Sequence, residues 1–230
     1  MKKYTTLLFD ADNTLLNFDK AERCALQKLL KFYNLPISEE NCRAYSQIND
    51  GLWKQFERGE IEKAQIKSTR FRKFFEHLKV DTPVDPNEAN DRYLNFLREG
   101  GYIIDGADEL CRILREKGYT LYIITNGIAL TQAVRFEKSG LLPYITDVFV
   151  SETIGFQKPK KEYFDFVLQN IHEADKSKVL VIGDSLSSDI QGAINSGLDF
   201  IWYNHKKADI PESINPSSVI NDIKELHGIL

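Results

Sequence analysis

Between residues 100 and 202 the chain alternates between short apolar stretches and amphipathic segments, and this alternation restricts the possible folds more than any other feature. The apolar, β-rich stretches are 119–125, 147–150, 178–182 and 199–202. The amphipathic segments before and between them are 106–117, 128–139, 160–171 and 187–196. Strands that alternate with helices predict a parallel sheet covered by helices on both faces. The expected fold class is therefore α/β and Rossmann-like.

The first 100 residues divide into one strand and a helical segment. The apolar stretch before Asp10 has the length of a buried strand, whereas 20–98 shows only helical periodicity, enough for a bundle of about four helices. The strand therefore belongs with the alternating half, and the bundle is an insertion. We expect an α/β core domain formed by 1–16 and 100–230 and a helical domain formed by 17–99. The linkers on either side could act as a hinge, with the bundle as a lid.

Two carboxylates, Asp10 and Asp12, follow the first strand directly. Alternate residues of a strand point to the same face, so extended geometry would turn both into one crevice at the carboxyl end of the sheet. Neighbouring carboxylates repel each other unless a cation lies between them, and oxygen ligands suit Mg²⁺. The pair alone does not decide the matter, because such pairs also occur in solvated loops and at helix starts.

Polar side chains also follow other predicted strands. Thr125 and Asn126 stand where free backbone N–H groups at a helix start could bind an anion. Lys158 precedes a proline and could act as a point charge against phosphate. Asp184 ends a strand, and Asp189 follows it across a turn. Each has a simpler explanation: a capped helix start, a solvated lysine, or an acid that stabilises a helix dipole. Their occurrence together at strand ends of one sheet favours a single site.

These segments resemble the four motifs of the haloacid dehalogenase-like (HAD) hydrolase superfamily. The motifs are Asp10-Ala11-Asp12-Asn13-Thr14, Thr125-Asn126-Gly127, Lys158-Pro159, and Gly183-Asp184 with Asp189. The match spans the whole chain, and the inserted bundle resembles the C1 cap of subfamily I. The sequence around the motifs looks most like that of the pyrimidine 5′-nucleotidase group.

The resemblance implies a role for each core residue. Asp10 would be the nucleophile that forms an aspartyl-phosphate. Asp12 would protonate the leaving oxygen and then deprotonate the hydrolytic water. Thr125 and the Asn126 amide would bind phosphoryl oxygens, and Lys158 would offset negative charge on Asp10 and the transferring group.

The resemblance also implies a cofactor, Mg²⁺. The Asp10 carboxylate, the Asp12 backbone carbonyl and Asp184 would bind the ion, with Asp189 as a ligand or as a partner of a ligand. The four histidines have no metal-ligand spacing, and the implied mechanism does not need them.

The residue two positions after the nucleophile narrows the reaction. Dehalogenases and transport ATPases of the superfamily lack an acid there, so Asp12 favours phosphate-ester chemistry. We expect a nucleoside 5′-monophosphate phosphatase that prefers pyrimidines. A sugar-phosphate phosphatase or phosphomutase stays open, as does an inactive phosphate-binding or signalling module. Trp53, Phe56 and Phe74 could stack on a base but are expected in the bundle core.

Composition limits the partners. Thirty Lys and Arg against 34 Asp and Glu give a net charge of −4, which offers no general basic field for a nucleic acid polymer. The three cysteines are odd in number and widely spaced, which fits a reducing cytoplasm. No stretch approaches the ~20 apolar residues of a membrane span. A small phosphorylated substrate, with no membrane partner, is the expectation.

Overall fold

The chain divides into two compact units in the computed structural model. The structure describes residues 3–79, 84–173, 175–215 and 218–230. One unit comprises Met1–Asn17 and Tyr102–Leu230, and the other Phe18–Gly101. The two chain crossings run side by side within the first unit, because Asn17 N–H donates to the Tyr102 carbonyl (2.9 Å) and Ile104 N–H donates to the Leu15 carbonyl (2.9 Å).

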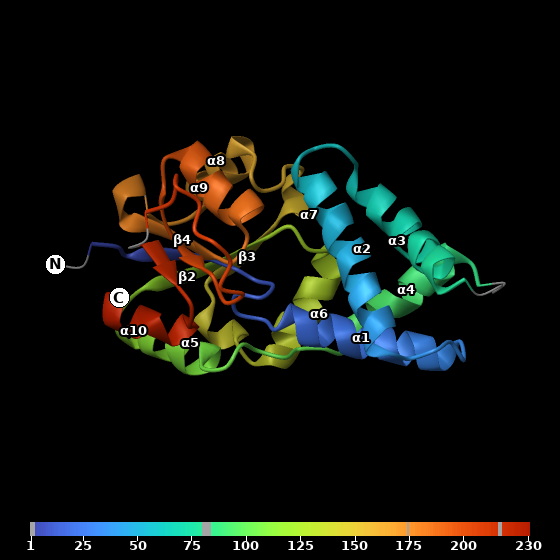
Figure 1. Ribbon diagram of the computed structural model, residues 1–230. Helices are drawn as coiled ribbons and strands as arrows, with labels where there is room; N and C mark the ends of the chain where they lie inside the picture. Colours follow the sequence, from blue (N-terminus) through green and yellow to red (C-terminus); the bar gives the residue numbers. More distant parts are fainter. Residues whose placement is uncertain (1–2, 80–83, 174, 216–217) are drawn as a thin grey trace. The chain divides into compact units, whose positions relative to one another are not determined.

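A six-stranded parallel sheet forms the centre of the first unit (Figure 1). Its strands are β1 (Thr6–Asp10), β2 (Thr120–Thr125), β3 (Asp147–Val150), β4 (Val179–Gly183), β5 (Asp199–Tyr203) and β6 (Val219–Ile220). Their order is β3-β2-β1-β4-β5-β6, so β1 lies between β2 and β4. The α/β fold class predicted from the alternating pattern is confirmed.

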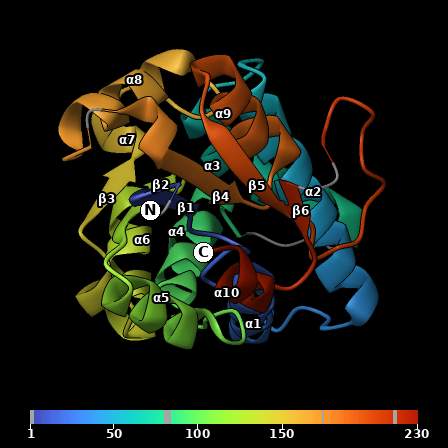
Figure 2. The same cartoon turned by 90° about the vertical axis from the view of Figure 1, so that its left-hand side faces the viewer.

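Helices cover both faces of this sheet (Figure 2). Leu7 and Phe9 of β1 pack into one core, together with side chains of α5, α6 and α10, whereas Leu8 packs into the other, together with side chains of α8 and α9. This alternation follows from the two-residue period of a strand. The helices of this unit are α5 (Ala107–Glu116), α6 (Ala129–Ser139), α7 (Ser151–Ile154), α8 (Lys161–Asn170), α9 (Gln191–Ser196) and α10 (Leu226–Ile229).

Several elements of the first unit differ from the sequence prediction. The helix expected over 187–196 begins as a π-helical turn, η3 (Leu186–Ile190), before α9. The edge strand β6 and the C-terminal helix α10 were not predicted, because two-residue strands and four-residue helices leave almost no periodic signal. The described part of the unit also contains the short 3₁₀ turns η1 (Leu142–Tyr144), η2 (Lys176–Lys178) and η5 (Ile223–Glu225).

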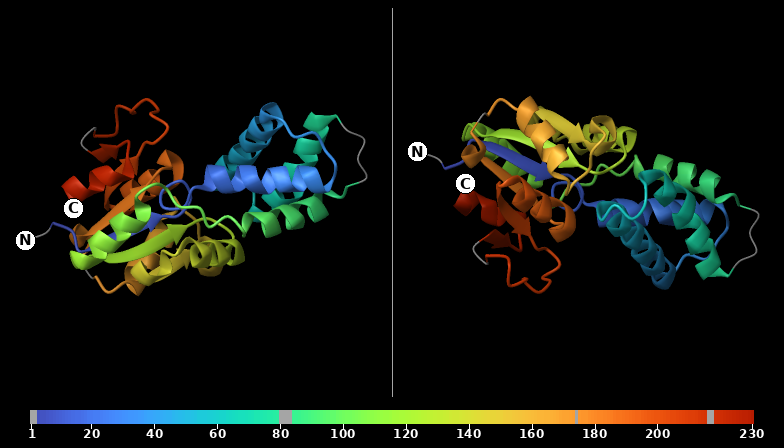
Figure 3. Two further views of the ribbon diagram at one scale, coloured as in Figure 1. Left: turned by 90° about the horizontal axis from the view of Figure 1, so that it is seen from below. Right: turned by 90° about the horizontal axis from the view of Figure 1, so that it is seen from above.

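The second unit is a bundle of α1 (Phe18–Phe32), α2 (Glu39–Glu57), α3 (Lys63–Leu78) and α4 (Pro86–Leu97). In this bundle α1 packs on α4, and α3 packs on both α2 and α4 (Figure 3, blue to green). Phe74 contacts Tyr45 in a fully buried aromatic cluster, and Phe56 packs with Trp53 in a second cluster. The expected place in the bundle core is thus confirmed for Phe56 and Phe74, whereas Trp53 is only partly buried. No helix within the described residues has both the length and the apolar character needed to cross a membrane.

A polar network lies inside the helical bundle. The Asn49 amide donates to Glu22 Oε1 (2.8 Å), and Arg70 Nε donates to Asn90 Oδ1 (2.8 Å). All four side chains belong to residues that are at most 4% exposed. Burial raises the pKa of Glu22 to about 7, because desolvation disfavours the charged carboxylate.

Candidate active site

The candidate site lies where the three central strands end. Asp10, the last residue of β1, is in register with Ile124 of β2, and the preceding Phe9 pairs with Ile182 of β4. Because the strands are parallel, the motifs that follow them share one edge of the sheet, where open α/β sheets bind ligands.

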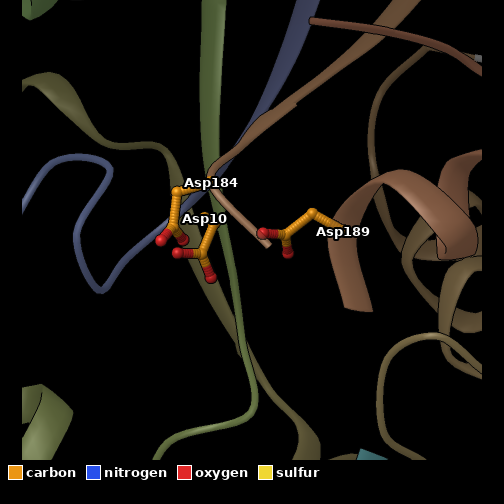
Figure 4. A group of neighbouring side chains, drawn as sticks. All are labelled: Asp10, Asp184 and Asp189. Carbon is orange, nitrogen blue, oxygen red and sulfur yellow. The ribbon is translucent and has the colours of Figure 1, made fainter. Parts of the chain in front are cut away.

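Three carboxylates meet at this edge. Asp10, Asp184 and Asp189 each offer one oxygen, and these oxygens all lie within 4.8 Å of one another. Figure 4 shows the Asp10 and Asp184 carboxylates next to each other, with Asp189 pointing toward them from a separate helical segment. Burial, reinforced by the Asp189 charge, raises the pKa of Asp10 well above its usual value, and burial also raises the pKa of Asp184. The cluster needs positive charge in order to stay ionised.

Lys158 supplies part of that charge. Its ammonium group donates to Asp10 Oδ1 (2.6 Å), to Asp189 Oδ1 (2.6 Å) and to the Ile124 carbonyl (2.9 Å). The side chain is only 1% exposed. Burial by itself would lower the pKa of Lys158, but the two carboxylates together raise it above its usual value. Lys158 is therefore a buried cation that bridges two of the three acids.

The donor set of this cluster suits a hard divalent cation. Three carboxylate oxygens converge on it, and Mg²⁺ prefers oxygen ligands. Among the four acids of the motifs, Asp10 and Asp189 contact Lys158, Asp12 contacts Arg135, and Asp184 Oδ2 lies 3.6 Å from His205 Nε2. The two buried cations, Lys158 and Arg135, offset only part of the negative charge of the four acids, and a divalent cation would offset more of it. Asp10, Asp184 and Asp189 are the side chains that could bind such an ion.

Asn126 fixes the segment that carries Lys158. Its side-chain amide donates to the Lys158 carbonyl (2.9 Å), and its side-chain oxygen accepts the Lys158 N–H (2.9 Å). Two hydrogen bonds to one backbone residue hold that residue in a single orientation. The Asn126 side chain thus holds the segment that carries Lys158.

Thr125 is held with its hydroxyl at the end of β2. Its Oγ1 accepts hydrogen bonds from Gly127 N–H (3.0 Å) and from Gln132 Nε2 (2.9 Å). A hydroxyl oxygen has two lone pairs and one proton, so an oxygen that already accepts twice directs its O–H toward a further acceptor. Tyr163 pins the same strand end by accepting the Thr125 backbone N–H (3.0 Å). Thr125 can thus donate to an anionic ligand.

Asp189 is placed by the π-helical turn. Besides Lys158, its carboxylate accepts the Ser185 N–H (3.1 Å), and the residue is fully buried. Gly183 is required next to it, because a Cβ at this position would overlap Asp189 Oδ2. Trp202 Nε1 donates to the Asp184 carbonyl (2.9 Å) and so fixes the intervening backbone. The whole β4–α9 connection is therefore shaped around two carboxylates.

Asp12 lies apart from the three-acid cluster. The strand ends at Asp10 and the chain bends at Ala11, so the i, i+2 rule no longer sets the direction of the Asp12 side chain. Its Oδ1 accepts from Arg135 Nη1 (2.5 Å) and its Oδ2 accepts from Gln132 Nε2 (2.7 Å). The expectation that alternation alone turns Asp10 and Asp12 into one cluster is therefore too simple.

The sequence analysis missed Gln132, Arg135, Ser185 and Tyr163. A signal existed for the first two, because polar residues three positions apart on the inward face of α6 are unusual. Both are 1% exposed. Ser185 and Tyr163 act through backbone contacts, which leave no comparable pattern.

Comparisons with known proteins agree with this geometry. The family model of the haloacid dehalogenase-like hydrolases matches residues 4–197. The HAD-hydrolase YfnB of Bacillus subtilis is 42% identical across 100% of this chain and 97% of its own. The pyrimidine 5′-nucleotidases PynA of Streptococcus pneumoniae and YjjG of Escherichia coli are 38% and 34% identical. They cover 97% and 99% of this chain, and 93% and 98% of their own chains are covered.

A solved structure extends the match to three dimensions. The crystal structure of Bacillus subtilis YfnB bound to magnesium, which reveals interdomain movement in that protein, has a TM-score of 0.92 at 40% identity. The match covers 100% of this chain and 99% of that one. The resemblances inferred from the motifs, to the superfamily and to its pyrimidine 5′-nucleotidase group, are confirmed. The chain belongs to the haloacid dehalogenase-like hydrolases.

Proposed function

We propose that this hydrolase is a Mg²⁺-dependent phosphomonoesterase that acts on nucleoside 5′-monophosphates and prefers pyrimidine bases. The observation that carries the reaction class is the buried contact between Asp10 and Lys158 at the end of β1. A carboxylate held against a buried cation beside two further acids is suited to attack phosphorus rather than to support the fold.

The reaction proceeds in two steps, formation and hydrolysis of an aspartyl-phosphate. An Asp10 oxygen attacks phosphorus in line, the P–O ester bond breaks, and the Asp12 proton goes to the leaving oxygen, which departs as the nucleoside hydroxyl. Water then attacks the aspartyl-phosphate, Asp12 takes the water proton, and inorganic phosphate leaves with Asp10 restored. Thr125 and the Asn126 N–H bind the phosphoryl oxygens, and Lys158 offsets the charge on the transferring group.

The metal would be held by Asp10, Asp184 and the backbone carbonyl of Asp12. Asp189, whose oxygens accept bonds from Lys158 and Ser185, would supply charge next to it. When bound, Mg²⁺ supplies electrostatic stabilisation of the phosphoryl group. The raised pKa values of Asp10 and Asp184, caused chiefly by burial, support this role because a divalent cation would favour their ionised forms.

The substrate class rests on the relatives. Two pyrimidine 5′-nucleotidases match nearly the full length of this chain, including the helical unit. We assign that unit, Phe18–Gly101, as the cap that selects the substrate, and the antiparallel chain crossings at 16–17 and 102–103 as its hinge. Cys24, Cys42 and Cys111 are free thiols, the state expected in the reducing cytoplasm where we place the enzyme.

The test is release of inorganic phosphate from uridine, thymidine, adenosine and sugar monophosphates, with Mg²⁺ or with EDTA. We expect the pyrimidine nucleotides to be the best substrates and EDTA to abolish release. Asp10→Asn should lower kcat by about 10³-fold or more. The matched control Asp209→Asn, at an exposed carboxylate, should keep full activity.

The possible outcomes separate the reaction from the substrate. Metal-dependent release that favours sugar phosphates would keep the mechanism and refute the nucleotide preference. An isomerised sugar phosphate without release would indicate a mutase. Full turnover by Asp10→Asn would refute the assigned nucleophile.

A further inference from the structure

The side chains of Gln132 and Arg135 hold the Asp12 carboxylate by hydrogen bonds. Each oxygen of the Asp12 carboxylate accepts one hydrogen bond, Oδ1 from Arg135 (2.5 Å) and Oδ2 from Gln132 (2.7 Å). The two donors are three residues apart on α6 and therefore lie on the same face of that helix. One donor for each oxygen fixes the plane of the carboxylate as well as its position.

Gln132 connects this support to the phosphate-binding segment. Its Nε2 donates to Asp12 and also to Thr125 Oγ1 (2.9 Å), while its Oε1 accepts from Arg135 Nη1 (3.0 Å). A Cβ at Gly127 would lie 2.7 Å from both Cγ and Nε2 of Gln132. The Thr125-Asn126-Gly127 motif thus leaves room for the Gln132 side chain, which ties Asp12 to the residue that binds phosphate.

Burial makes this arrangement costly as a purely structural device. The Arg135 side chain is 1% exposed, whereas the Asp12 side chain is 29% exposed. A buried arginine loses most of its hydration, and apolar residues of similar volume often stabilise a fold as well or better. A desolvated arginine that contacts a partly exposed carboxylate is better explained by a function of that carboxylate than by a contribution to stability.

We propose that Gln132 and Arg135 are positioning residues that orient the Asp12 carboxylate for proton transfer to the leaving oxygen. This inference rests on the proposed phosphatase function. Neither residue touches the reacting atoms. They act through Asp12 by selecting one of its rotamers. Gln132 also contacts Thr125, so it fixes the Asp12 carboxylate relative to the residue that we propose to bind the phosphoryl oxygens.

The test compares two leaving groups. A nucleoside leaves as an alcohol and needs a proton, whereas p-nitrophenol leaves as a stabilised anion and needs none. The ratio kcat/KM covers the steps up to formation of the aspartyl-phosphate, where the leaving oxygen is released. General acid catalysis contributes about 10²–10⁴-fold, so Arg135→Met and Gln132→Met should lower kcat/KM for uridine monophosphate by about 10–100-fold. For p-nitrophenyl phosphate the loss should stay within about threefold for Arg135→Met. For Gln132→Met it should be smaller than the loss for the nucleotide, although this variant also removes the hydrogen bond to Thr125 Oγ1.

Two controls make the result specific. Lys138→Met removes an exposed cation from the same helix and should leave kcat/KM unchanged for both substrates. In an Asp12→Asn background residue 12 cannot donate a proton. Adding Arg135→Met to this background should therefore lower kcat/KM for the nucleotide no more than kcat/KM for the nitrophenyl ester. Circular dichroism checks that each variant is folded, and Gln132→Met carries the test if Arg135→Met does not fold.

Equal losses on both substrates in the folded variants would overturn the positioning role, because a general structural defect does not distinguish leaving groups. A further selective loss in the Asp12→Asn background would overturn it as well. A wild-type enzyme that hydrolyses neither ester would instead refute the proposed function itself. The two failures are therefore distinguishable.

Discussion

Replacing Lys158 by methionine removes a buried cation from between two acids. In the native structure the ammonium group donates to Asp10 and Asp189 at 2.6 Å each, and to a backbone carbonyl at 2.9 Å. Methionine has a similar length and no charge. In the variant both carboxylates stay buried, at 7% and 0% residue exposure, without their shared partner.

The contacts set the size of the effect. Breaking a buried ion pair by removing one partner costs about 3–5 kcal/mol, and hydrogen bonds to charged groups are worth about 1.5–3 kcal/mol each. We therefore expect Lys158→Met to lower the free energy of unfolding by about 4 kcal/mol at pH 7.5 in EDTA. Natural domains are stable by about 5–15 kcal/mol, so the loss is a large share of the total.

The loss should depend on pH in a definite direction. Burial and the Asp189 charge already raise the pKa of Asp10, and Lys158 opposes them. Without Lys158 the folded-state pKa lies still further above the unfolded value of about 3.9. A carboxyl group of this kind binds a proton more readily in the folded state, so its contribution to stability falls as pH rises above about 4. The deficit of Lys158→Met should therefore be smaller at pH 5 than at pH 7.5.

Urea unfolding followed by tryptophan fluorescence measures both effects. Trp202 is buried in the α/β unit, and Trp53→Phe removes the signal from the helical unit. The matched control Lys160→Met, at an exposed lysine two residues away, should shift stability by no more than about 0.5 kcal/mol. A loss below about 1 kcal/mol for Lys158→Met, or an equal loss at both pH values, would refute the charge argument.

Two further predictions follow from burial. Gly183→Ala would press a methyl group into Asp189 and should cost about 1–3 kcal/mol of stability by urea unfolding and at least about tenfold in kcat, while Gly228→Ala, with open space around it, should do neither. Glu22, with a pKa of about 7 against about 4.3 unfolded, should make the helical unit less stable as pH rises from 4.5 to 7, by up to about 3 kcal/mol. Glu22→Gln should flatten that slope in Trp53 fluorescence; a slope that persists would assign it to other groups.

The architecture could be predicted from the sequence because most strands give two separate signals. A run such as 147–150 is apolar, and it is followed by polar or glycine residues where the chain leaves the sheet. The strand that ends in Asp10, β1, lies inside the sheet between β2 and β4, which agrees with ligand binding at the ends of central strands. β6 gives no such signal, because two residues that pair only at an edge need no distinctive pattern.

Side-chain networks were harder to predict than strand ends. Lys158 could be expected to face phosphate, but its simultaneous contact with Asp10 and Asp189 depends on how the π-helical turn projects Asp189. Helical periodicity treats 187–196 as regular and so misplaces the first turn. Contacts of this kind depend on local irregularities that a periodic pattern averages away.

Asp12 shows most clearly where a local rule stops and a tertiary one begins. Alternation along a strand places residues i and i+2 on one face only while the strand lasts, and β1 ends at Asp10. Beyond the bend, the direction of Asp12 is set by two donors from α6, more than 100 residues further along the chain. The carboxylate that we propose to donate and accept a proton thus lies outside the three-acid cluster, and its contacts are with α6. The separation of Asp12 from Asp184 and Asp189 fits the proposed two-step chemistry, and α6 is the element that holds Asp12 in this place.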